Sequence, residues 1–104
     1  MWYWIKTPLL FKKIFLNQIW DIPSEESVVY LTFDDGPNKV MTEKILAILS
    51  MNSVRASFFC IGKNVEKYPE EYQKIIAQGH SVGNHSMTHP MGWGKSKKMY
   101  LKDI

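Results

Sequence analysis

"VVYLTFDDGPN", residues 28–38, is the stretch that decides how this sequence folds. Residues 28–33 are β-branched, aromatic or aliphatic, a composition typical of a buried strand. Two neighbouring carboxylates, Asp34 and Asp35, follow directly, and a glycine and a proline come next. Like charges repel at this separation and a turn needs only one acid, so the pair needs an explanation.

Helical and strand patterns alternate along the rest of the chain. We expect helices at 38–51 and 68–79 and strands at 54–61 and 80–85, with Asn38 capping the first helix and Ser96 opening a further one. The broad apolar face of the first helix comprises Val40, Ile45, Leu46, Ile48 and Leu49. This alternation predicts an α/β fold, in which parallel strands are joined by helical crossovers.

Parallel α/β folds place their chemistry in the loops beyond the carboxyl ends of their strands. Asp34 and Asp35 follow the first predicted strand, and His85 follows the third. All three side chains are therefore expected at the edge of the sheet where active sites form.

The segment "GNHSMTH", residues 83–89, contains two histidines, His85 and His89, four positions apart. This spacing lets both imidazoles face one point, although such a pair can also arise by chance on a surface. Together with a carboxylate from another strand end, the pair makes three protein ligands and leaves one position open. That arrangement is typical of catalytic rather than structural zinc.

The histidine pair offers an explanation for the two acids. One aspartate completes the metal site, and its neighbour stays free to take up a proton. The alternative is an ordinary acidic turn before a helix, because Asp, Gly and Pro are common turn formers. The strand before the acids and the histidines after another strand favour the metal site.

Composition sets limits on the class of protein. The chain has 104 residues, 45% hydrophobic and 22% charged, which indicates one small globular domain. The net charge of +3 is carried by residues 95–104. We interpret this basic segment as a solvated helix rather than as a surface that binds nucleic acid. Cys60 is the only cysteine, so no intramolecular disulfide can form, and we expect a buried thiol.

Residues 1–27 are interpreted as an amino-terminal extension that packs on the domain. Phe11, Phe15 and Ile19 recur at helical spacing, but lysines and a proline keep the apolar stretches well below the roughly 20 residues of a spanning helix. A helix on a membrane surface is the less favoured alternative. No signal peptide is recognised, and a cytoplasmic location is the default expectation.

Several segments resemble one known family. "TFDDGP" (32–37) and "HSMTH" (85–89) resemble the first two signature motifs of the polysaccharide deacetylases, the NodB-homology or carbohydrate esterase family 4 enzymes. "ASFFCIGKNV" and "GHSVGNH" resemble the segments between these motifs. The resemblance implies a distorted (β/α) barrel, of which residues 28–104 would form the amino-terminal half, truncated at its carboxyl end.

The resemblance also implies roles for individual residues. Asp34 would be the general base, Asp35, His85 and His89 would bind a divalent metal, usually Zn²⁺, and Ser86 would brace the loop. The implied reaction is hydrolytic removal of N-acetyl or O-acetyl groups from a polysaccharide such as chitin, peptidoglycan or xylan.

The later signature motifs of this family are not found in the sequence. They would supply the acid, an arginine that orients the base, and the oxyanion donor. The alternative function is therefore a non-catalytic remnant that binds metal or saccharide without turnover. Trp93 can be read as a sugar-stacking residue or as a loop anchor, and neither the substrate-binding residues nor the oligomeric state can be assigned.

Overall fold

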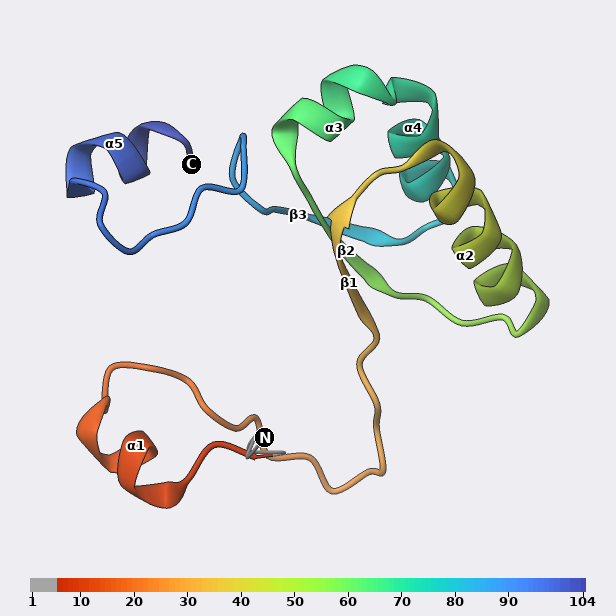
Figure 1. Ribbon diagram of the computed structural model, residues 1–104. Coiled ribbons are helices and arrows are strands. Elements are labelled where there is room, and N and C mark those ends of the chain that lie inside the picture. The colour runs from red at the N-terminus through yellow and green to blue at the C-terminus, as the bar shows by residue number, and fades with distance from the viewer. Residues whose placement is uncertain (1–5) are drawn as a thin grey trace, which may run out of the picture.

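The computed structural model describes residues 6–104, which form a parallel sheet and the helices beside it (Figure 1). The strand order is β1-β2-β3, with β1 at Thr32–Gly36, β2 at Ser57–Cys60 and β3 at Ser81–Asn84. Helix α2 (Lys39–Met51) joins β1 to β2, whereas α3 (Gly62–Lys67) and α4 (Pro69–Ala77) join β2 to β3. The predicted α/β fold with parallel strands and helical crossovers is confirmed.

The register of the sheet aligns the carboxyl ends of the strands. Gly36 of β1 pairs with Cys60 of β2, which in turn pairs with Asn84 of β3. Between Asp34 and Gly36 the register shifts, so that Asp35 has no partner in the ladder. The residues that follow the three strands therefore share one edge, as the sequence predicts.

The core lies between the sheet and two helices. Its buried hydrophobic residues are Leu46 and Leu49 of α2, Ala56, Phe58 and Cys60 in and beside β2, and Ile75 of α4. Phe33 of β1 stacks on Phe58, with ring centroids 5.2 Å apart. Cys60 is buried as predicted, and its burial raises the pKa of the thiol.

Two predicted helix starts, at Asn38 and Ser96, are confirmed by their hydrogen bonds. Asn38 Oδ1 accepts from the backbone N–H groups of Val40 and Met41, at 3.0 and 3.1 Å, at the start of α2. Ser96 Oγ accepts from the N–H of Met99, at 3.3 Å, and opens α5 (Lys97–Lys102). Gly79, just beyond α4, adopts the left-handed φ of 78° that commonly ends a helix.

The predicted limits of the first strand are wrong at both ends. The strand begins at Thr32 rather than Val28 and continues to Gly36. Val29 and Tyr30 are 82% and 79% exposed. The reason is the length of the neighbouring strand: β2 begins at Ser57, whose N–H donates to Leu31 O, so residues before Leu31 have no ladder to join.

The predicted apolar face of α2 is too broad. Leu46 and Leu49 are buried and Ile45 packs against the core, but Val40 and Ile48 are exposed. Only a narrow apolar stripe of α2 therefore packs against the core.

The helix predicted at 68–79 ends at Ala77 and is preceded by a further helix, α3, that local patterns do not predict.

The amino-terminal segment contains one short helix, α1 (Leu9–Ile14), which has no buried residues. Figure 1 shows α1 set apart from the sheet. The helical pattern predicted through Ile19 is wrong beyond Ile14. Packing of the extension 1–27 on the domain stays a prediction, and residues 1–5 lie outside the described part of the chain.

Within residues 6–104, the structure contains no helix with the length and apolar character needed to cross a membrane.

Candidate metal centre

Two strand tips bring together one carboxylate and two imidazoles. Asp35 Oδ1 lies 3.2 Å from His85 Nε2 and 3.5 Å from His89 Nε2. The two imidazole ring centroids are 4.8 Å apart, and the candidate ligand atoms of the three residues all lie within 4.8 Å of one another. The structure therefore gathers Asp35, His85 and His89 around one point.

The backbone at the end of β1 places Asp35 in this cluster. Asp35 has a φ of 67° and sits at the irregularity in the ladder between Asp34 and Gly36. This left-handed conformation is uncommon for a residue other than glycine and costs about 1–3 kcal/mol. Asn64 of α3 donates from Nδ2 to Asp35 O at 2.8 Å. A contact from a neighbouring helix thus supports the strained peptide.

A compact turn orients the two histidines. His85 continues the ladder, since its N–H donates to Cys60 O at 3.0 Å. Ser86 and His89 both have left-handed φ values, 63° and 53°. The N–H of Ser86 donates to Asn84 Oδ1 at 2.7 Å, and Ser86 Oγ accepts from the N–H of His89 at 2.9 Å. The Ser86 hydroxyl thus connects the two ends of the turn.

Helix α3 holds the same turn from the side. The N–H of Gly62 donates to Ser86 O, and the N–H of Lys63 donates to Met87 O, both at 3.0 Å. A Cβ on Gly62 would collide with Met87 Sδ and lie 3.3 Å from Met87 Cα, so a larger residue here would displace the Met87 side chain and press on its backbone. The sequence patterns do not identify the supporting residues Asn64 and Asn84, although Asn84 directly precedes His85.

The cluster is open to solvent. The side chains of Asp35 and His89 are 64% and 56% exposed, and that of His85 is 29% exposed. A cavity of about 280 Å³ is lined by His85, Ser86 and His89 together with Asn84, Pro90, Tyr100 and Ile104. A ligand at the cluster would therefore be reachable from outside.

Asp34 is placed beside the cluster but not in it. It is exposed and lines a second cavity, of about 390 Å³, together with Asp35, Asn38 and residues of α2. Within the described part of the chain, its carboxylate makes no hydrogen bond or ion pair. A carboxylate without a partner remains available to accept a proton.

The third histidine, His80, lies elsewhere. It is buried, and its Nδ1 accepts from the N–H of Ala56 at 3.2 Å. Burial lowers the pKa of His80, and the positive charge of Arg55 lowers it further. His80 is thus a structural residue at the start of β3.

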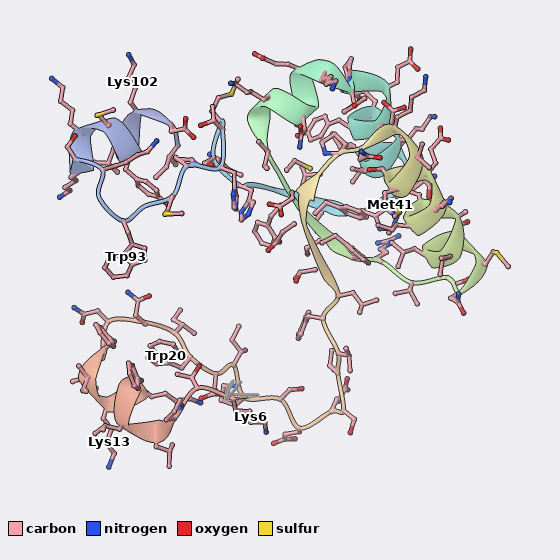
Figure 2. The ribbon with its side chains drawn as sticks, viewed as in Figure 1. Lys6, Lys13, Trp20, Met41, Trp93 and Lys102 are labelled. Atoms are coloured by element: carbon pink, nitrogen blue, oxygen red, sulfur yellow. The ribbon has the colours of Figure 1, made fainter. Side chains whose placement is uncertain are left out.

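Trp93 is 91% exposed and points away from the ribbon in Figure 2. This exposure excludes the loop-anchor reading.

The donor set of the cluster fits a divalent metal. Two neutral imidazoles and one carboxylate are the ligand types that zinc takes in proteins, and three protein ligands leave a position for water or substrate. The candidate ligand atoms lie within 4.8 Å of one another, so Asp35, His85 and His89 are the residues that would hold the ion.

Known proteins are similar to this chain in sequence and in fold. A family model described as polysaccharide deacetylase matches residues 21–104. The chitooligosaccharide deacetylase of Sinorhizobium fredii is 52% identical over 62 residues, which are 60% of this chain and 29% of that protein. The structure of peptidoglycan deacetylase PdaC from Bacillus subtilis covers 80% of this chain and 41% of its own length, with 41% identity and a TM-score of 0.72.

A third match is the structure of a family 4 acetyl xylan esterase from Clostridium thermocellum in complex with a cobalt ion. It covers 72% of this chain and 37% of its own length, with 33% identity and a TM-score of 0.66. The chain spans less than half the length of each of these three proteins. The structural matches confirm the predicted fold, since the open parallel sheet corresponds to part of a NodB-type (β/α) barrel. By sequence and by fold, the chain belongs to the polysaccharide deacetylase family.

Proposed function

We propose that this chain is the metal-binding part of a deacetylase that hydrolyses N-acetyl or O-acetyl groups on a polysaccharide of the chitin or peptidoglycan type. The observation that carries the proposal is the convergence of Asp35, His85 and His89 at two strand tips. The names of the relatives, which are chitooligosaccharide and peptidoglycan deacetylases, support the substrate class.

The three residues would hold the metal, for which we propose Zn²⁺. The cobalt ion of the related acetyl xylan esterase structure supports a divalent metal. When bound, such an ion polarises the acetyl carbonyl and lowers the pKa of a water molecule. Ser86 would keep the turn in shape through its hydrogen bond to the N–H of His89.

Asp34 would act as the general base. It lies on the same strand as the proposed ligand Asp35 and makes no ion pair within residues 6–104, so its carboxylate can take the proton of the attacking water. The two neighbouring acids thereby receive different roles: Asp35 binds the metal and Asp34 moves the proton.

Metal affinity tests the ligand assignment. We expect the chain to bind Zn²⁺ in a competition titration with a chelating dye, and His85→Ala and Asp35→Asn to lose most of this affinity. Asp34→Asn is the matched control, because it removes the neighbouring negative charge from the same strand tip and should keep the metal. Equal loss of affinity in Asp34→Asn and Asp35→Asn would refute the division of roles.

Acetate release tests the reaction. For the natural protein that contains these residues, we expect acetate from N-acetylglucosamine oligomers, loss of release with a chelator, and recovery with Zn²⁺. Asp34→Asn should abolish release while the metal stays bound. Metal binding without any acetate release would instead favour the alternative, a remnant that binds metal or saccharide without turnover.

A further inference from the structure

Asp103 is hydrogen-bonded at several points to the turn that carries His85 and His89 (residues 85–89). Its Oδ2 accepts from the backbone N–H of Thr88 at 2.8 Å, and its Oδ1 accepts from the Thr88 hydroxyl at 2.7 Å. The backbone carbonyl oxygen of Asp103 accepts from the N–H of Met87 at 2.6 Å. One residue, distant in sequence from the motif, thus binds the two positions just before His89.

Local helix chemistry does not account for an aspartate at this position. Asp103 is the residue that ends α5, where the helix dipole disfavours a negative charge. The two hydrogen bonds from Thr88 offset this cost, because bonds to a charged acceptor are the stronger kind. They also lower the pKa of Asp103, the Thr88 hydroxyl having the largest effect. The carboxylate is therefore explained by its contact with the turn.

The hydrogen bonds from Thr88 to Asp103 hold the part of the turn that has an uncommon backbone conformation. His89 has a left-handed φ of 53°, and Ser86 has one of 63°, so the segment between them is held in an uncommon conformation. Ser86 and Met87 are held by α3 on one side. Thr88 is held by Asp103, and Figure 1 shows α5 beyond the carboxyl end of β3, away from α3. The turn is thus fixed from two directions.

We propose that Asp103 is a positioning residue for the metal centre: by accepting both polar hydrogens of Thr88, it orders the turn that directs His85 and His89 toward Asp35. The effect on metal binding rests on the proposed function. The effect on the order of the turn does not, since it follows from the hydrogen bonds between Asp103 and Thr88 alone.

The experiment measures both effects on the full 104-residue chain. Asp103→Asn removes one of the two carboxylate acceptors and the charge, and Thr88→Val removes the hydroxyl while keeping the N–H. Thr88→Ser keeps both donors and should behave as the unaltered chain does. Glu43→Gln is the control, because the Glu43 carboxylate also accepts a side-chain hydrogen bond, from Lys74, but lies on α2.

Without metal, we expect faster amide hydrogen exchange at Thr88 and His89 in Asp103→Asn and Thr88→Val, and unchanged exchange in Glu43→Gln. With metal, we expect the Zn²⁺ dissociation constant of these two variants to rise about tenfold, as for other residues that support metal ligands indirectly. The visible spectrum of bound Co²⁺ should also change, which a loss of overall stability alone would not cause.

Unchanged exchange and unchanged affinity in both variants would overturn the proposal, as would an equal effect of Glu43→Gln. If circular dichroism shows that Asp103→Asn is unfolded, the comparison of Thr88→Val with Thr88→Ser decides whether the hydrogen bonds to Asp103 order the turn. If the unaltered chain binds no Zn²⁺, the proposed function fails, and the exchange rates alone decide whether Asp103 orders the turn.

Discussion

The side chain of Asn64 donates a hydrogen bond to the backbone carbonyl oxygen of Asp35, with Nδ2 and O 2.8 Å apart. Asn64 lies on α3 and Asp35 at the tip of β1, so this bond connects two elements that approach only in the folded chain. It supports the residue whose φ of 67° places a carboxylate beside two imidazoles. A residue outside the candidate metal centre thus contacts the backbone of one of its three members.

We therefore predict that Asn64→Ala weakens Zn²⁺ binding by about fivefold, which corresponds to the roughly 1 kcal/mol of an ordinary hydrogen bond. A competition titration with a chelating dye measures this change. Asn52→Ala is the control, because Asn52 Nδ2 donates to Ile48 O at the same distance of 2.8 Å but at the far end of α2. An equal loss of affinity in both variants would contradict a specific role for Asn64.

The sequence predicts the candidate ligands because their signals are local. Asp35 follows an apolar run, and His85 and His89 stand four apart after another strand pattern, so the rule for parallel sheets places them at one edge. The caps at Asn38 and Ser96 are predicted for the same reason, since a cap depends on the next few residues only.

Helix α3 could not be predicted in this way. Its six residues include a glycine and an asparagine and only one apolar side chain, Val65, so they show no helical pattern. The first two N–H groups of the helix instead find their acceptors on Ser86 and Met87, more than twenty positions along the chain. Such contacts depend on the assembled sheet, as does the length of β1, which is limited by the start of β2.

Two adjacent isoleucines on α4 test the position of the core. Ile75 is 0% exposed and Ile76 is 43% exposed. Removing one buried methyl group from isoleucine costs about 0.5–1.5 kcal/mol, whereas an exposed methyl contributes little. We predict that Ile75→Val lowers the free energy of unfolding in urea by about 1 kcal/mol and that Ile76→Val leaves it nearly unchanged. The reverse order would show that α4 packs on the sheet with another face.

The third histidine gives the stability a dependence on pH. His80 Nδ1 accepts a hydrogen bond from the N–H of Ala56, which only the neutral imidazole can do. Its other nitrogen, Nε2, is buried without a partner among the described residues. Burial, with a smaller effect from Arg55, lowers the pKa of His80 below its ordinary value of 6.5. Folding therefore favours the neutral form.

The sign of the effect follows from proton binding. Between the lowered pKa of folded His80 and 6.5, the unfolded chain binds more protons, so the free energy of unfolding rises with pH. The stabilisation is complete above 6.5 and is lost as the pH falls through the folded-state pKa. We predict that acidification from about pH 7.5 to about pH 5 destabilises the unaltered chain more than His80→Asn, whose side-chain oxygen can still accept from Ala56 without gaining a charge. Urea unfolding of both proteins at the two pH values measures the difference. The same loss of stability in both would mean that His80 is not kept neutral by the fold.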